Sequence, residues 1–412
     1  MSMILPAALI GLLTISLLGQ RFVHLPKNVW LLFLAQPLGM STSSIIVFAG
    51  GLVATKIAPK PEFATLPLTL MILGTASAVI PASLLMKKIG RRKGTACGLT
   101  LAVFGALLSA AATQWSEFYL LIAGAILLGC SMAFVAQMRF AAIESLSDIK
   151  DSPKAISVLM IGGMFAAIIG PEAAVVGKDW IESPHGYTGS FLLLAGLLVV
   201  AIAIVLNLNS IETAEKHVDG ETRSLRVIVR QPIFLVAVCA GAIAYSVMSY
   251  IMTATPLSMH EIDGHSLQDT KWVVQSHIIA MYLPSLFSAV IIRYLGLAKL
   301  MVVGSIIYIS VIVIGFMGNH FLHYWWVMVL LGIGWNFLFT SGTLLLPESY
   351  RPSERFKTQA LNDFTIFFVQ ALASLSAGMV IFGFGWYKLL LIALPAIIAM
   401  LLLSFWYWLR KD

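Results

Sequence analysis

The chain has 412 residues, of which 59% are apolar and only 11% are charged. That share of charge is too small to cover a water-soluble protein of this length, so the composition predicts an integral membrane protein. The formal net charge of +7 then reflects basic loops beside anionic lipid headgroups and gives no indication of nucleic-acid binding.

Twelve long apolar runs account for most of the chain. They cover residues 29–53, 63–86, 95–113, 117–138, 154–175, 188–207, 231–256, 271–293, 299–316, 324–345, 358–381 and 386–409. A helix of about 20 residues crosses a hydrocarbon core of about 30 Å. The runs lack the apolar–polar alternation of membrane β-barrel strands. The sequence therefore predicts an all-α membrane protein.

The basic residues are placed unevenly around these runs. Of the 26 Lys and Arg residues, 21 fall before the first run, after the last, or in every second gap between them. Cytoplasmic flanks of membrane helices hold an excess of Lys and Arg. We therefore expect a multi-pass protein of the cell inner membrane, with both ends of the twelve-helix body in the cytoplasm.

A further apolar stretch, residues 3–19, precedes the first run. It has no basic n-region and no Ala-x-Ala-like cleavage site, so we do not expect a removed signal peptide. About 17 apolar residues is the lower limit for crossing a bilayer. A thirteenth span with an external N-terminus and a helix lying in the interface both remain open.

The longest polar interruption divides the runs six and six. The predicted parts are an N-terminal segment 1–28, an N-terminal half 29–207, a cytoplasmic linker 208–230 and a C-terminal half 231–412. The halves echo each other, because Ile143-Glu144-Ser145-Leu146 matches Pro347-Glu348-Ser349-Tyr350 and Lys87-Lys88-Ile89-Gly90 matches Arg293-Tyr294-Leu295-Gly296. Two such repeats are typical of a transporter with a solute site between them near mid-membrane.

The loop after the second run resembles the signature of the major facilitator superfamily, written G-x-x-x-D-R-x-G-R-R. Gly90, Arg91 and Arg92 match it, whereas Ser83 replaces the leading glycine and Lys87 replaces the aspartate. The resemblance covers residues 29–409 in layout. It implies a twelve-helix bundle of two pseudo-symmetric six-helix halves that transports a small organic solute by alternating access.

Other segments bear on direction and substrate. Ala166-x-x-x-Gly170-Pro171 resembles part of a signature of antiporter members, without its later glycines. The segments 351–364 and 253–260 look like a bacterial branch of the family, in which some members are thought to take up vitamins such as riboflavin. Vitamin uptake, drug or siderophore export and a receptor or complex-subunit role are the alternatives.

A guanidinium near the end of the fourth run is one candidate for solute binding. Arg139, beside Gln137, could anchor an anionic group, because a charge inside the hydrocarbon layer is costly and needs a reason. The alternative is a basic side chain that snorkels to the headgroups.

Uncharged polar and aromatic side chains extend the predicted substrate site. These candidates are Gln36, Tyr245, Ser249, Gln275, Tyr282, Trp335 and Asn336. The alternative for each is a hydrogen bond between helices, which is common in membranes.

Two carboxylates inside predicted spans are candidates for proton coupling. Glu172 follows Gly170-Pro171, where burial would raise the pKa of a carboxyl group, although an interfacial, solvated carboxylate is the alternative we favour. Asp363 lies one to two turns into the eleventh run, where the helix dipole alone favours a carboxylate. His277 is the next candidate because it titrates near neutrality, unless it is merely interfacial.

The sequence contains no nucleotide-binding G-x-x-x-x-G-K-[ST] motif, nucleophile elbow or H-E-x-x-H. We therefore expect no enzyme, no metal and no cofactor. The partners we expect are a small organic solute, protons and the lipid bilayer, and the chain is expected to be monomeric. The prediction is secondary active, proton-coupled transport.

Lys87, Gly90 and Arg91 are predicted to take part in gating, with Lys87 and Asp363 as a reversed form of the family's cytoplasmic lock between the second and eleventh spans. Loss of one partner from a partly buried pair costs several kcal/mol, enough to shift a two-state equilibrium by more than about a hundredfold. Lys87→Asp should therefore impair transport, and adding Asp363→Lys should restore it in part. A double variant no better than either single one, at equal membrane expression, would show that the two are not partners.

Overall fold

The computed structural model describes residues 3–148, 151–209 and 223–411, and the regular structure within them is helical. The chain forms two compact units, residues 1–214 and 215–412. The middle of the predicted linker, residues 210–222, lies outside the described residues. The boundaries 29–207, 208–230 and 231–412 therefore stay predictions.

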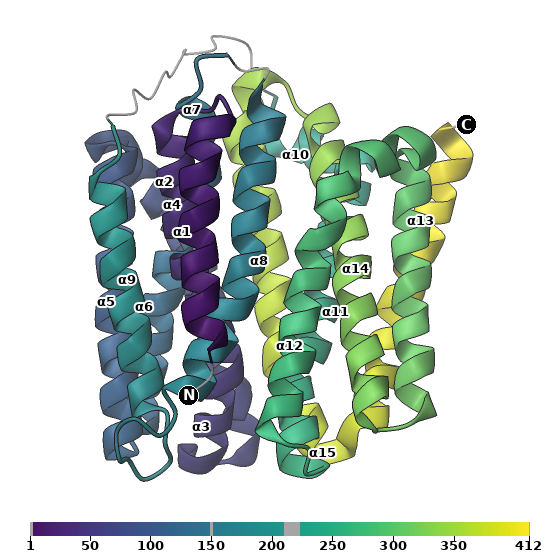
Figure 1. The fold of residues 1–412 in the computed structure, drawn as a ribbon. Coiled ribbons are helices and arrows are strands. Elements are labelled where there is room, and N and C mark those ends of the chain that lie inside the picture. Colours follow the sequence, from purple (N-terminus) through teal and green to yellow (C-terminus); the bar gives the residue numbers. More distant parts are fainter. Residues whose placement is uncertain (1–2, 149–150, 210–222, 412) are drawn as a thin grey trace. The chain divides into compact units, whose positions relative to one another are not determined.

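Unit 1 contains the following elements: α1 (Ile4–Phe22), α2 (Lys27–Ile45), η1 (Ile46–Gly50), α3 (Gly51–Ile57), η2 (Pro61–Thr65), α4 (Leu66–Ile89), α5 (Arg91–Trp115), α6 (Phe118–Ala136), α7 (Met138–Glu144), α8 (Ser152–Val176) and α9 (Thr188–Leu206). Helices α2, η1 and α3 follow one another without a break and make up the first predicted span. The long helices of this unit run alongside one another (Figure 1).

Unit 2 contains the following elements: α10 (Leu225–Val229), α11 (Pro232–Pro256), η4 (Leu257–Ile262), α12 (Leu267–Tyr282), η5 (Leu283–Phe287), α13 (Ser288–Met317), α14 (Phe321–Leu345), η6 (Leu346–Ser349), η7 (Pro352–Glu354) and α15 (Arg355–Lys411). Helices α13 and α15 are each interrupted by a glycine with positive φ, Gly296 and Gly385. Each interruption is the turn between two predicted spans.

The helices follow the predicted runs closely. In the described part of the chain, 11 helical stretches are long and apolar enough to cross a membrane, and one of them, Lys357–Arg410, is 54 residues long because it holds two runs. The run 271–293 is divided among α12, η5 and the first turns of α13, so no single helix there reaches the length of a span. The predicted all-α membrane fold is confirmed.

Both units use the same packing scheme. In unit 1, α2 packs against α8 and α9, while α5 packs against α6 and α9, and α4 against α6. In unit 2, α11 packs against α15, while α13 packs against α14 and α15, and α12 against α14. Because α15 contains the fifth and sixth helices of its half, equivalent helices have equivalent neighbours.

Two glycine turns have the same backbone in the two units. Gly90, between α4 and α5, has φ 83° and ψ 160°. Gly296, inside α13, has φ 72° and ψ 165°. An L-residue at positive φ is strained, so glycine is required here by conformation; open space surrounds both positions. The sequence echo between residues 87–90 and 293–296 thus reflects a shared turn.

Small residues set the distance between helices. A Cβ added to Gly170 on α8 would meet Ser44 at 2.5 Å and the Ser41 carbonyl at 3.2 Å on α2, and one added to Gly162 would meet Pro37 at 3.3 Å. Close approach of this kind is what stabilises helix pairs in lipid, where apolar burial gives no net gain.

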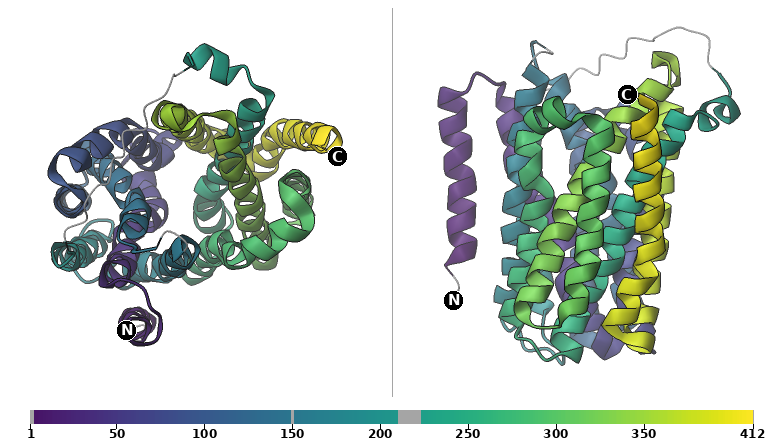
Figure 2. Two further views of the ribbon diagram at one scale, coloured as in Figure 1. Left: turned by 90° about the horizontal axis from the view of Figure 1, so that it is seen from above. Right: turned by 90° about the vertical axis from the view of Figure 1, so that its right-hand side faces the viewer.

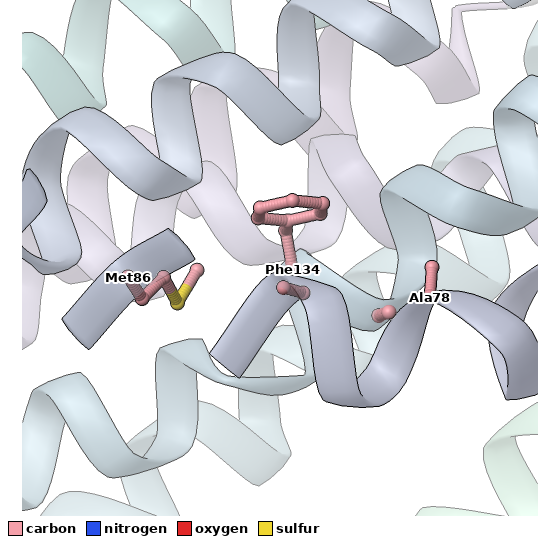
Figure 3. Close-up of a cluster of buried hydrophobic side chains, with 5 residues drawn as sticks. Ala78, Met86 and Phe134 are labelled. Carbon is pink, nitrogen blue, oxygen red and sulfur yellow. The ribbon is translucent and has the colours of Figure 1, made fainter. Parts of the chain in front are cut away.

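A buried apolar cluster joins α4 to α6 within unit 1. It consists of Ala78, Ala82 and Met86 from α4 with Ala133 and Phe134 from α6 (Figure 3). The Phe134 ring also fills the space above Gly98 of α5, where an added Cβ would overlap the ring. The cluster fixes the ends of α4 and α6 that lie next to the Gly90 turn.

Candidate functional site

A hydrogen-bonded cluster surrounds Arg91 at the end of unit 1 that carries its basic loops, called here its basic end. The Arg91 guanidinium donates to both oxygens of Glu144 at 2.6 and 2.9 Å and to Gln137 Oε1 at 2.9 Å. Gln137 Nε2 donates to Ser83 Oγ at 3.2 Å. A guanidinium that donates to both oxygens of a carboxylate forms a strong ion pair with a fixed geometry. The signature loop is thereby tied to α7.

The Arg91 cluster occupies a break in the fourth span. Gln137 separates α6 from α7, and its backbone N–H donates to the Phe134 carbonyl at 3.1 Å, three residues back. Arg139 follows on α7 with an exposed side chain. Gln137 therefore contacts Arg91 and Ser83 here, and the predicted solute-binding roles of Gln137 and Arg139 stay predictions. Glu144, which sequence reasoning did not select, stood in the repeated segment 143–146.

The interior of unit 1 contains the predicted residues Gln36 and Glu172. Gln36 is half-buried on α2 and its Oε1 has no hydrogen-bond partner among the described residues. Glu172 is fully buried on α8, with 0% of its surface exposed. The expectation that Glu172 is solvated was wrong, because its side chain lies on a covered face of α8 although it is near the end of the helix.

An aromatic cluster forms in unit 2 around Tyr245 of α11. The Tyr245 ring centroid lies 5.2 Å from that of Trp335, 5.1 Å from Phe339 and 5.9 Å from Phe367. Tyr282 joins at 6.5 Å from Trp335, edge to face. Such geometry places ring edges against ring faces, which stabilises each pair by roughly 0.5–1.5 kcal/mol. Tyr245, Phe339, Phe367 and Tyr282 remain half-buried.

Polar groups lie beside the aromatic cluster. Gln370 Nε2 of α15 donates to Ser249 Oγ of α11 at 2.6 Å, and a hydroxyl pair joins Thr253 and Ser374 at 3.2 Å. In this group of side chains, Gln370 Oε1, an acceptor, and Trp335 Nε1, a donor, have no hydrogen-bond partner among the described residues. Sequence reasoning selected Ser249 and Trp335 but missed Gln370, which is one of a polar series at i, i+4 with Ser374.

Three other predicted residues are buried in unit 2. Asn336 Nδ2 donates to the Met281 carbonyl at 2.7 Å and to Ser285 Oγ at 2.5 Å. His277 is fully buried, with Nδ1 at 2.8 Å from the Met328 carbonyl, and its predicted coupling role stays a prediction. Gln275 is 3% exposed. The bonds of Asn336 and His277 link α12 to α14.

Lys87 and Asp363, which are predicted to form a cytoplasmic lock, belong to different units. Lys87 is in the last turn of α4, and its side chain lies outside the described side chains. Asp363 is half-buried on α15, where its Oδ1 accepts from Asn362 Nδ2 at 3.0 Å. The Lys87–Asp363 pair therefore stays a prediction.

A buried carboxylate anchors the end of the linker to unit 2. Glu354, whose side chain is 0% exposed, accepts from Arg223 Nη2 at 2.7 Å and from the backbone N–H of Arg223 at 2.6 Å. The N–H of Arg351 adds a further bond at 2.9 Å, and Lys357 Nζ donates to the Arg223 carbonyl. The Arg223 guanidinium and these N–H groups hold the pKa of Glu354 well below its ordinary value.

Two similarly packed units of helices long and apolar enough to cross a membrane are the architecture of a transmembrane transporter. Residues 29–268 match the family described as Major Facilitator Superfamily. The chain belongs to the major facilitator superfamily, and it is accordingly a transporter and not an enzyme.

Named relatives support this assignment. The chain is 33% identical over 363 residues to the riboflavin transporter RfnT of Brucella anthropi, a match that covers 87% of this chain and 90% of RfnT. It is also 27% identical to two uncharacterised MFS-type transporters of Bacillus subtilis. YdeG matches over 399 residues, 93% of this chain and 92% of its own length, and YddS matches over 403 residues, 93% and 91%.

Glu354→Gln should destabilise the protein at neutral pH, because it leaves Arg223 and several N–H groups facing an amide. A carboxylate whose folded pKa is lowered stabilises the fold above the unfolded pKa of about 4.3, and this contribution is lost as the pH falls towards the folded value. The Tm in detergent should drop by several degrees at pH 7, and the difference should shrink below about pH 4. Exposed Glu348→Gln is the control. Equal Tm values at pH 7 for wild type and Glu354→Gln would contradict the stabilising role of the Glu354–Arg223 contact.

Proposed function

We propose that the chain takes up riboflavin or a closely similar flat, aromatic solute, by alternating access driven by protons. The observation that carries the proposal is the 33% identity to a riboflavin transporter over 87% of the chain. Export of a drug or siderophore and a receptor role each predict a different result in the uptake experiment described next.

The chemistry of unit 2 supports a flat solute. Riboflavin has a planar ring system with carbonyl and N–H groups along one edge. The aromatic cluster presents half-buried ring faces from three helices, α11, α14 and α15. The unpaired Trp335 Nε1 can donate to a carbonyl, and Gln370 Oε1 can accept from an N–H. Aromatic surface with a few placed polar groups is typical of small-molecule sites.

Uptake of labelled riboflavin into proteoliposomes is the direct test. A pH gradient, acidic outside, should drive accumulation, whereas the reverse gradient should not. The same vesicles should be offered other vitamins, siderophores and drugs. Accumulation of a drug or siderophore in place of riboflavin would overturn the substrate assignment, and absence of transport for the whole panel would favour a receptor role.

Phe367→Ala should raise the KM for riboflavin uptake by roughly tenfold with little change in expression, because a ring–ring contact contributes up to about 1.5 kcal/mol and 1.4 kcal/mol is tenfold. Phe364→Ala, one turn away on α15, is the matched control, since Phe364 is 52% exposed and stacks only on Phe368 among the described residues. Equal KM values for the two variants would remove the aromatic cluster from the proposed site.

Glu172 and Asp363 are the proposed coupling groups. A buried carboxyl group can take a proton from one side and release it to the other when its surroundings change. Glu172→Gln or Asp363→Asn should abolish accumulation against a gradient while exchange of solute across the membrane continues. Exposed Glu182→Gln is the control for the charge change. Wild-type accumulation by both variants would require another coupling group.

A further inference from the structure

Helix α1 precedes the twelve predicted spans and packs along unit 1. It contains 19 residues, Ile4–Phe22, and therefore measures about 28 Å at about 1.5 Å per residue. A hydrocarbon core is about 30 Å thick. The helix is thus long enough to cross the bilayer almost completely.

Two contacts fix the direction in which α1 runs. Near its C-terminal end, Gly19 lies against the Trp30 ring in the first turn of α2, and Ser16 Oγ donates to the Trp30 carbonyl at 3.4 Å. Further back, a Cβ on Gly11 would lie 3.5 Å from the ring of Phe165, in the middle of α8. Moving from Gly19 to Gly11 therefore leads from the basic end of unit 1 to the middle of its helices.

One narrow face of α1 is buried and continues along the whole helix. The buried residues are Leu5, Ala8, Leu12, Ser16 and Gly19. They recur at intervals of three and four residues, so they lie on one side of the helix. Because Leu5 is buried, the contact extends beyond the middle of the unit to the first turn of α1. Figure 2 shows α1 running alongside the unit, with its N-terminal end away from the loop to α2.

The exposed surface of α1 is apolar over most of its length. From residue 4 to residue 18 the exposed side chains are apolar except for Thr14, and they include Ile10 at 65% and Leu17 at 58% exposure. A helix that lies in the interface needs a charged or strongly polar face. The charge of α1, Arg21, is in its last turn, at the basic end. Lipid acyl chains are the surroundings that fit such a surface.

From these observations we infer that α1 is a thirteenth membrane-spanning helix. It docks against α2 and α8 through its narrow buried face, contacts lipid with the remainder, and places its Met3 end on the side opposite the basic loops. This topology is independent of the solute that the protein carries.

Cysteine labelling in cells tests the inference, in a variant in which Cys97, Cys130 and Cys239 are replaced by Ser. A membrane-impermeant maleimide should label Met3→Cys in intact spheroplasts, whereas His24→Cys should be labelled only after permeabilisation. Labelling of Met3→Cys only after permeabilisation would overturn the inference.

A cross-linking experiment tests the docking and decides the case in which Met3→Cys is never labelled. Gly11→Cys and Phe165→Cys should be joined by a short bifunctional maleimide, and His24→Cys with Phe165→Cys should not. Adding Gly19→Leu should reduce the cross-link severalfold, since any Cβ there overlaps the Trp30 ring. Thr14→Leu, on the exposed face, should leave the yield unchanged. Absence of the Gly11–Phe165 cross-link would refute the docking and, with it, the thirteenth span.

Discussion

Backbone N–H and C=O groups have no water to bind inside a hydrocarbon layer, so each must be satisfied within the protein. This constraint explains why the described residues form helices and where those helices are interrupted. The turns at Gly90, Gly296 and Gly385 fall between spans, and the break at Gln137 lies at the basic end of unit 1. At that break the Arg91 guanidinium bonds to the side chains of Gln137 and Glu144 and so ties the ends of α6 and α7 to the start of α5.

Each unit has an arginine–glutamate ion pair after its fourth helix, but the arginine comes from a different segment in each. In each unit an arginine forms a two-pronged bond with a carboxylate that follows the fourth helix of the half, Glu144 in unit 1 and Glu354 in unit 2. The unit 1 arginine comes from the signature loop. The corresponding position in unit 2 is Leu297, after Gly296, so the turn is retained without the charge. Arg223 of the linker supplies the guanidinium there, which gives the linker's end a structural role.

Depth in the membrane could be predicted from the sequence, but the direction of a side chain around its helix could not. Hydropathy located the spans because transfer into lipid depends on the sum over a segment. Glu172 shows the limit: counting residues from Lys154 correctly placed it near the end of α8, yet its burial depends on which neighbour that face meets. His277 shows the same limit, since its bond to the Met328 carbonyl depends on the packing of α12 on α14.

Hydrogen bonds between residues far apart in the sequence could not be predicted from the sequence either. Nothing in periodicity links Arg223 to Glu354 or Gln370 to Ser249, because such bonds depend on three-dimensional packing. The repeat between the halves was the one long-range signal in the sequence. It predicted the shared turn at Gly90 and Gly296 and drew attention to Glu144 without assigning it a role.

Several buried polar atoms of unit 2 lack partners among the described residues, including Trp335 Nε1, Gln370 Oε1 and Tyr250 Oη. Each such atom costs about 1–3 kcal/mol if it stays unpaired. In a purely structural helix bundle this would be a defect. A solute that pairs with these atoms better in one conformation than in another binds the two conformations with free energies that differ by a similar amount. Only such a difference in affinity between conformations can shift a conformational equilibrium. In the proposed function, the unpaired groups on α11, α14 and α15 of unit 2 are therefore the candidates for coupling solute binding to movement.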